Sequence, residues 1–142
     1  KIAESKNKVA YKDFAHSPSK VSATTKAVKA QYPDRKVVAC LELHTYSSLN
    51  AEFLKEYQGA LDAADVAVVF YSPDAVKIKR LEEVTYDQIA QSFQREDLII
   101  YTNPVEFKDF LFSQNLENSA LLLMSSGNYG GLNFDEVKGL IK

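Results

Sequence analysis

The sequence has 142 residues but only one cysteine, Cys40, and no tryptophan. A single thiol excludes an intrachain disulfide framework, which suits a reducing compartment, so we expect a cytoplasmic protein. Cys40 lies inside an apolar run and is interpreted as a core side chain without an activating neighbour. No apolar run approaches the roughly 20 residues of a membrane helix, and no signal peptide is visible, so we expect no membrane partner.

An excess of charge and the common catalytic motifs are also lacking. The formal net charge is −2, which argues against nucleic acid as a partner because that binding needs a dominant basic face. No P-loop ending in Gly-Lys-Ser/Thr, no Gly-x-Gly-x-x-Gly turn and no Gly-x-Ser-x-Gly hydrolase elbow occurs. Two histidines distant in sequence do not predict a zinc site. We therefore assign no catalytic and no metal-binding residue to this chain.

The sequence does contain apolar runs that are typical of buried strands. Four runs rich in Val, Ile, Leu and Tyr show no clear alternation, as expected of parallel strands that are covered on both faces. A fifth strand is expected over residues 8–14, with residues 2–5 as its antiparallel hairpin partner. The four runs cover residues 36–43, 65–71, 97–102 and 119–125.

Helical spacing of apolar side chains separates these strands. Ser17, Asn103 and Asn133 are expected to begin helices, and Thr85 with Gln88 forms a candidate capping box. The order strand–helix, repeated five times, predicts one α/β domain over residues 1–142: a Rossmann-like, open, doubly wound, mostly parallel sheet of about six strands with helices on both faces. The helical stripes are Val21, Thr24, Val28 and Tyr32; Phe53, Leu54, Tyr57 and Leu61; Tyr86, Ile89, Ala90 and Phe93; Phe107, Phe110 and Leu111; and Phe134, Val137 and Ile141.

In such a sheet the loops after the parallel strands share one edge, where ligands bind. Both histidines, His16 and His44, fall in those loops. Asp13 and His16 fit a nucleotide site, since a carboxylate accepts hydrogen bonds from ribose hydroxyls, but they equally fit a capped loop with local packing. The glycines of residues 126–131 fit either close approach to a ligand or a plain strand-to-helix turn.

Three blocks of the sequence resemble the C-terminal domain of Mur ligases, in the same order. Residues 13–19, Asp-Phe-Ala-His-Ser-Pro-Ser, are similar to the family's Asp-(Phe/Tyr)-(Ala/Gly)-His-His-Pro-Thr segment. Residues 41–47, Leu-Glu-Leu-His-Thr-Tyr-Ser, resemble segments written Phe-Glu-Pro-Arg-Ser-Asn-Thr or Phe-Gln-Pro-His-Arg-Tyr-Ser. Residues 124–132 resemble Met-Ser-Asn-Gly-Gly-Phe-Gly-Gly-Ile. The resemblance therefore spans nearly the whole chain.

The resemblance implies an ATP-dependent, amide-bond-forming ligase of bacterial cell-wall synthesis or recycling. Such enzymes phosphorylate a carboxylate of a UDP-N-acetylmuramate-type substrate, and the amine of an amino acid or peptide then attacks the acyl phosphate. ATP and Mg²⁺ would be held mainly by a central P-loop domain, so this chain would be one part of a three-domain enzyme and inactive alone. The implied nucleotide-binding residues are Asp13, Phe14 and His16; the implied acceptor-substrate residues are His44, Tyr46, Ser47, Ser126, Gly127 and Asn128.

The sequence also departs from the family pattern. Ser17 replaces the usual second His, Ser19 the usual Thr, and Leu43 the usual Pro. His44 stands where members that accept a peptide have Arg and matches instead the members that add L-alanine, whereas residues 124–132 favour a peptide acceptor. Two alternatives stay open: a non-catalytic, flavodoxin-like nucleotide-binding module on the same sheet, and a related folate-type polyglutamate ligase.

Overall fold

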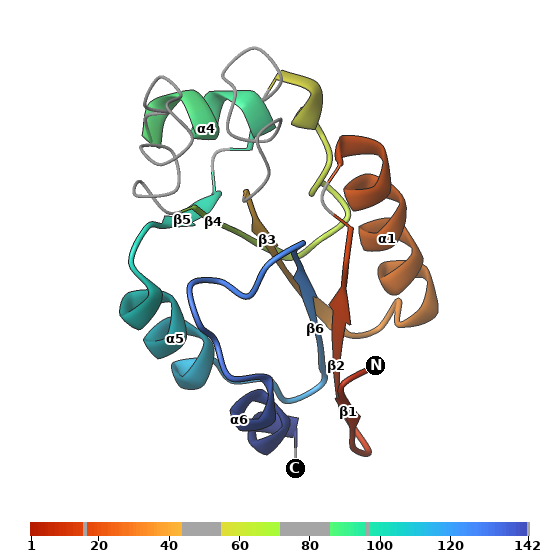
Figure 1. The fold of residues 1–142 in the computed structure, drawn as a ribbon. Coiled ribbons are helices and arrows are strands. Elements are labelled where there is room, and N and C mark those ends of the chain that lie inside the picture. The colour runs from red at the N-terminus through yellow and green to blue at the C-terminus, as the bar shows by residue number, and fades with distance from the viewer. Residues whose placement is uncertain (16, 44–54, 72–85, 96, 142) are drawn as a thin grey trace.

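The computed structural model describes residues 1–15, 17–43, 55–71, 86–95 and 97–141. Its centre is a six-stranded sheet in the order β1-β2-β6-β3-β4-β5 (Figure 1). Only β1 is antiparallel to its neighbour, and the other four strand pairs are parallel. The predicted open, mostly parallel sheet with an N-terminal hairpin is thereby confirmed. The strands are β1 (Ala3–Glu4), β2 (Lys8–Asp13), β3 (Lys36–Glu42), β4 (Val66–Phe70), β5 (Ile99–Tyr101) and β6 (Ser119–Met124).

Helices cover both faces of the sheet and create two hydrophobic cores. One core lies under α1, α4 and η2, and the other lies under α5 and α6. Successive residues of β3 alternate between them, with Ala39 in the first core and Cys40 in the second. This two-sided burial explains why the strands lack polar alternation. The helices are α1 (Pro18–Gln31), η2 (Lys55–Tyr57), α4 (Tyr86–Phe93), α5 (Pro104–Ser113), α6 (Phe134–Lys138) and η3 (Gly139–Ile141).

Three helix starts follow the predicted caps, with one difference. The Asn103 side chain accepts hydrogen bonds from the backbone N–H groups of Val105 and Glu106, and Asn133 caps α6 in the same way. Ser17 occupies the N-cap position of α1, but its side chain makes no capping hydrogen bond. Pro18 as the first helical residue therefore fixes this helix start without help from the hydroxyl. Thr85 lies outside the described residues, so its capping box stays a prediction.

The second predicted helix is wrong over its described part. Residues 55–57 form a single 3₁₀ turn, η2, and turns follow it to residue 63. Gly59 has a φ of +75°, which a right-handed helix cannot accommodate, so the chain turns there. Tyr57 and Leu61 are nevertheless buried, which explains their apolar spacing. Phe53 and Leu54 lie outside the described residues.

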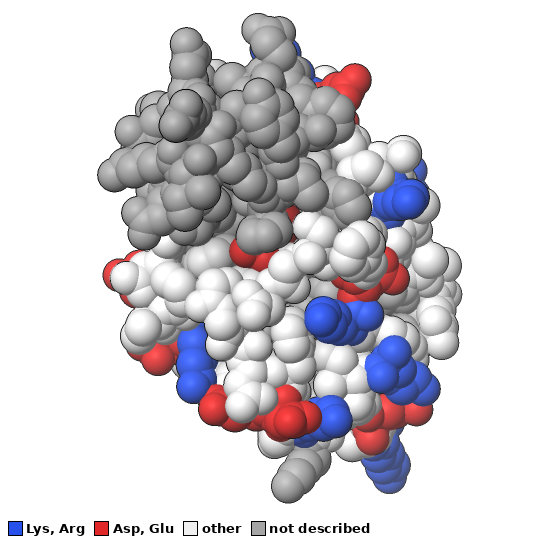
Figure 2. Space-filling view, viewed as in Figure 1, with Lys and Arg blue, Asp and Glu red and all other residues white. Residues whose placement is uncertain are grey.

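Strand β5 also differs from the prediction, because its three residues are only half-buried. Among the described strands it lies at the edge of the sheet, next to β4 alone. Among the described residues, no helix is both long enough and apolar enough to cross a membrane. Lysine, arginine, aspartate and glutamate side chains are interspersed over the described part of the face in Figure 2, as the net charge of −2 would suggest.

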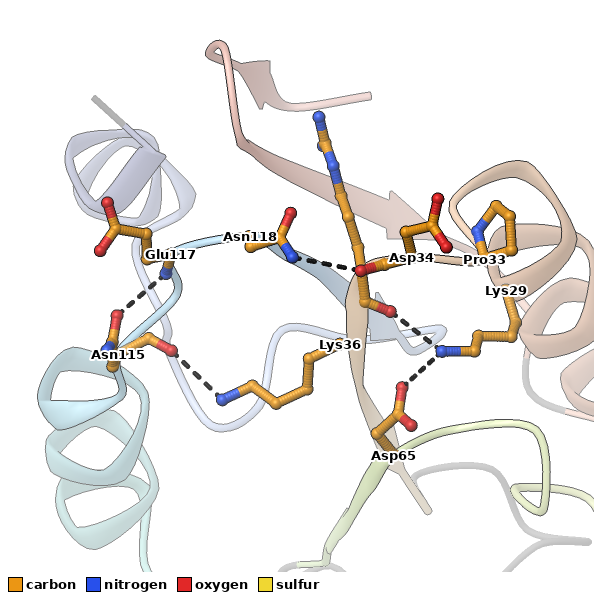
Figure 3. Close-up of a pocket in the computed structure, with 9 residues that line it drawn as sticks. Lys29, Pro33, Asp34, Lys36, Asp65, Asn115, Glu117 and Asn118 are labelled. Carbon is orange, nitrogen blue, oxygen red and sulfur yellow. Dashed lines mark hydrogen bonds and ion pairs between the residues drawn. The ribbon is translucent and has the colours of Figure 1, made fainter.

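A hollow of about 530 Å³ lies at the edge of the sheet where the parallel strands begin, and its lining includes both acidic and basic side chains (Figure 3). Lys29 Nζ lies 2.9 Å from Asp65 Oδ2 and 3.0 Å from the Arg35 carbonyl oxygen. The same Asp65 oxygen accepts a hydrogen bond of 2.8 Å from the Val37 N–H. These contacts tie the end of α1 to the starts of β3 and β4, so they serve the fold.

Asp65→Asn is expected to lower the free energy of unfolding by about 0.5–1 kcal/mol at pH 7, since the ion pair is partly exposed. Burial works to raise the pKa of Asp65, but the hydrogen bonds from Val37 and Lys29 and the charges of Lys29 and Arg95 hold it below its usual value. The stabilisation is therefore present above the unfolded pKa of about 3.9 and disappears as the pH falls through the lower folded value. Urea unfolding of both proteins from pH 7 to about pH 2 measures this convergence.

Asp34→Asn is the matched control because Asp34 is an exposed aspartate of the same hollow. Its backbone carbonyl, which accepts from Asn118, survives the substitution. We expect a change within about 0.5 kcal/mol at every pH. A pH-independent loss in Asp65→Asn would contradict the assignment to an ionised pair.

Candidate functional site

The candidate site lies at the edge of the sheet where β6 ends between β2 and β3. The chain leaves β2 for α1 on one face of the sheet but leaves β6 for α6 on the other face. The connections therefore diverge on either side of the carboxyl end of β6, as Figure 1 shows. Such divergence opens a crevice at the carboxyl edge, where ligands of open α/β sheets bind.

At the end of β2, Asp13 and Phe14 occupy this edge. The Asp13 carbonyl accepts a hydrogen bond of 3.0 Å from the Ser125 N–H, which joins the β2 and β6 loops. Asp13 Oδ1 accepts a hydrogen bond of 2.8 Å from the Ala15 N–H. One carboxylate oxygen therefore caps the loop, as the simpler of the two sequence interpretations required. A nucleotide contact by this side chain stays a prediction.

The Phe14 side chain is 70% exposed, which is unusual for a large apolar residue. It lines a hollow of about 250 Å³ together with Asp13, Lys20 and Thr24. Lys20 and Thr24 come from the first turns of α1, which passes beside the end of β2. The hollow thus combines an aromatic ring, a carboxylate, an ammonium group and a hydroxyl, a set that suits a polar ligand with a flat ring.

At the end of β3, the buried side chain of Glu42 is bonded to the loop after β6. Glu42 is 3% exposed, and its Oε1 accepts a hydrogen bond of 2.5 Å from the Ser125 hydroxyl. The same oxygen accepts a bond of 2.9 Å from the Tyr129 N–H. Ser125 Oγ in turn accepts a bond of 2.7 Å from the Gly127 N–H. A chain of buried and partly buried hydrogen bonds therefore joins two strand ends to one turn.

Tyr129 anchors the other end of this turn. Its hydroxyl lies 2.9 Å from the Cys40 carbonyl oxygen and 2.7 Å from that of Met124, so its single proton is shared between two acceptors. Its ring stacks on Phe107 with 4.8 Å between ring centres. Burial raises the pKa of the Tyr129 phenol well above its usual value, so the group stays a neutral donor. Burial likewise raises the pKa of the Cys40 thiol, which agrees with its interpretation as a core residue.

The residues on either side of Tyr129 form a tight turn. Asn128 Oδ1 and its carbonyl both accept from the Gly131 N–H, at 3.2 and 3.1 Å. Gly130 has a φ of +74°, and a Cβ atom there would lie 2.7 Å from the Pro104 ring. The close approach that Gly130 allows is therefore to α5, and for this glycine the plain-turn interpretation is correct. A hollow of about 420 Å³ lies beside it, lined by Pro104, Val105, Lys108, Asp109, Gly130, Gly131 and Leu132.

UDP-N-acetylmuramate–L-alanine ligases are among the curated relatives of this chain. No family model matches the chain. It is 28% identical over 120 residues, 82% of its length, to the UDP-N-acetylmuramate–L-alanine ligase of Sulfurihydrogenibium sp., and ligases of the same name from other bacteria also match. The chain is a homologue of the Mur ligases. It spans about a quarter of the length of the Sulfurihydrogenibium relative, 26%.

Solved Mur ligase structures share the fold. The murein peptide ligase of Psychrobacter arcticus superposes with a TM-score of 0.72 over 95% of this chain and 28% of that protein, at 15% identity. A domain of a proposed UDP-N-acetylmuramate:L-alanyl-γ-D-glutamyl-diaminopimelate ligase from Haemophilus ducreyi gives 0.59 over 95% of this chain and 89% of that one, at 24% identity. The predicted resemblance to a Mur ligase C-terminal domain is confirmed.

The structure brings the described members of the two predicted groups of residues to one edge. Asp13 ends β2 and Phe14 follows it, while Ser126, Gly127 and Asn128 follow the adjacent β6. The predicted residues His16, His44, Tyr46 and Ser47 lie outside the described residues. In the described part of the chain, no group of three or more potential metal ligands occurs.

Three residues of this edge were not predicted as site residues. Lys20 is an exposed residue of α1 and Tyr129 belongs to a glycine-rich turn, so neither carries a local signal of a site. Glu42 carried a usable signal, because an acid that ends an otherwise apolar, buried strand must find hydrogen-bond partners. Which partners it finds depends on β6 lying next to β3, and strand order is not encoded locally.

Proposed function

We propose that this chain is the C-terminal domain of an ATP-dependent ligase of peptidoglycan synthesis or recycling, which joins an amino acid or peptide to UDP-N-acetylmuramate. The observation that carries the proposal is the homology with UDP-N-acetylmuramate–L-alanine ligases over 82% of the chain. In this proposal ATP phosphorylates the muramate carboxylate, the acceptor amine attacks the acyl phosphate, and inorganic phosphate leaves. The enzyme would work in the bacterial cytoplasm, where its nucleotide substrates occur.

The roles of this domain are to bind and position, because it has no phosphate-binding loop. We propose that Asp13, Phe14 and His16 contact the nucleotide, and that His44, Tyr46, Ser47 and the turn 126–128 face the acceptor. The hollow beside Phe14 supports the first role, since its ring and the adjacent carboxylate suit a base and a ribose. ATP and Mg²⁺ would be held mainly by a separate P-loop domain of the longer protein.

For the acceptor we propose a peptide rather than free L-alanine. Support comes from residues 124–132, which are similar to the block Met-Ser-Asn-Gly-Gly-Phe-Gly-Gly-Ile of murein peptide ligase. L-Alanine is the second candidate, favoured by His44 and by the names of the curated relatives. His44 is shorter than Arg and often neutral near pH 7, so a peptide carboxylate would meet an altered contact.

The test uses the full-length protein that contains this chain, supplied with UDP-N-acetylmuramate, ATP and Mg²⁺. One reaction receives L-alanine, one receives L-alanyl-γ-D-glutamyl-diaminopimelate, and a third receives both in competition. Mass spectrometry identifies the amide product, and phosphate release measures the rate. The 142-residue chain alone is assayed in parallel and is expected to turn over no ATP.

Amide formation with preference for the peptide is the expected result. A clear preference for L-alanine would overturn the peptide proposal and leave the alanine-adding ligase. Nucleotide binding without any amide product would overturn the ligase itself and favour a non-catalytic nucleotide-binding module. ATP turnover by the isolated chain would contradict the proposed division of labour between domains.

A further inference from the structure

Glu42 lies beneath a turn that we assign to the acceptor, and it is the last residue of β3. Across the sheet, its Oε1 is bonded to Ser125 and Tyr129, which bracket the turn 126–128. No other described side chain is seen to accept hydrogen bonds from both ends of this turn.

The contacts of Glu42 leave the turn little freedom. The Ser125 hydroxyl both donates to Glu42 and accepts from the Gly127 N–H, so one side chain fixes the first half of the turn. The Tyr129 N–H, held by the same oxygen, belongs to a residue with a φ of +56°. Non-glycine residues avoid that region unless their surroundings impose it. The bond to Glu42, together with the buried phenol, supplies that constraint.

The strands that lead to this edge are held by the hydrogen bonds of the sheet. Leu41 and Met124 are paired in register between β3 and β6, and the Leu43 N–H bonds to the Phe70 carbonyl. The ladder thus holds the strands up to the edge, and beyond it the Glu42 and Tyr129 contacts add to the backbone bond that joins the β2 and β6 loops. Removal of the Glu42 carboxylate leaves two buried donors, the Ser125 hydroxyl and the Tyr129 N–H, without this acceptor. The loss is costly because buried hydrogen bonds are stronger than those in water.

We propose that Glu42 is a positioning residue for acceptor binding: it holds the turn 126–128 in place at the carboxyl end of β6. This inference rests on the proposed ligase function. Glu42 touches no reacting atom, and its action passes through Ser125, Gly127 and Tyr129. Removal of the Glu42 side chain should therefore weaken acceptor binding and leave nucleotide binding at the end of β2 unchanged.

The test compares Glu42→Ala, Glu42→Gln and Val28→Ala in the full-length protein. Val28 is buried in the core beneath α1 and has no part in the site, so its variant controls for general destabilisation. The Michaelis constants for acceptor, ATP and UDP-N-acetylmuramate are measured separately for each protein. Amide exchange of Gly127 and Tyr129 is followed as a readout that is independent of activity.

Glu42→Ala is expected to raise the KM for the acceptor about tenfold or more, the effect of one lost hydrogen bond to a charged group, with the KM for ATP within about twofold. The Gly127 and Tyr129 amides should exchange faster. Glu42→Gln should recover most of both effects, because its amide oxygen can still accept from Ser125 and Tyr129. Val28→Ala should leave all three constants unchanged. Where Glu42→Ala does not fold, Ser125→Ala should raise the same KM.

Two results would overturn the inference while wild-type protein still ligates. One is a change in Glu42→Ala that affects all three substrates alike, as general destabilisation would. The other is Glu42→Gln behaving like Glu42→Ala, since geometry would then not be the cause. Absence of ligation by the wild-type protein would instead overturn the proposed function, so the two failures are distinct.

Discussion

Replacing Phe107 by alanine is expected to lower the free energy of unfolding by about 3–5 kcal/mol. Phe107 is fully buried on α5 and stacks on Tyr129 at 4.8 Å, with Phe70 at 5.5 Å. Its loss empties the centre of the second core, and Tyr129 loses the ring that holds it against the sheet. Because a domain is stable by only about 5–15 kcal/mol in total, the variant should melt roughly 10–20 °C lower.

Phe112→Ala is the matched control on the same helix. The Phe112 side chain is 37% exposed and packs beside the Lys108 ammonium, 5.4 Å from its ring centre. Alanine also has the higher helix propensity, so we expect a change of less than about 1 kcal/mol. Thermal and urea unfolding monitored by circular dichroism give both values. Equal losses in the two variants would show that the stack on Tyr129 does not matter for stability.

Most of the fold could be predicted from local patterns. Apolar runs located β3, β4, β5 and β6, and a hairpin pattern located β1 and β2. Asn103 and Asn133 located two helix starts, because strand burial and helix capping are properties of neighbouring residues. The second helix failed because spacing alone cannot separate a helix from turns that bury Tyr57 and Leu61; Gly59 was the local warning. The half-burial of β5 could not be predicted, since it follows from strand order.

The site was less predictable because it is assembled from distant segments. Placing Asp13 and the turn 126–128 on one edge required only that the strands be parallel. The bond between Glu42 and Ser125 joins residues 83 positions apart and depends on β3 and β6 being neighbours. The role of Asp13 in capping its own loop is local, but sequence could not rank it against ligand binding.

Asp13→Ala in the full-length protein is expected to raise the KM for ATP about ten- to a hundredfold. The reason is the loss of charge-assisted hydrogen bonds to the nucleotide, which contribute on the order of 1.5–3 kcal/mol. Asp13 Oδ1 also accepts from the Ala15 N–H, so the same variant should lose about 1 kcal/mol of stability through the uncapped loop. Initial rates at varied ATP, with thermal unfolding on the same protein, measure both effects.

Asp13→Asn separates the two roles of this side chain. Its amide oxygen can still accept from the Ala15 N–H, so the loop stays capped and the melting temperature should be unchanged. The neutral amide makes weaker hydrogen bonds to ribose hydroxyls than the carboxylate does, because charge-assisted hydrogen bonds are the stronger kind. The KM for ATP should therefore still rise severalfold. If Asp13→Asn kept the wild-type KM while Asp13→Ala lost only stability, Asp13 would be a loop cap alone. The nucleotide assignment would then have to move to Phe14 and the hollow that it lines.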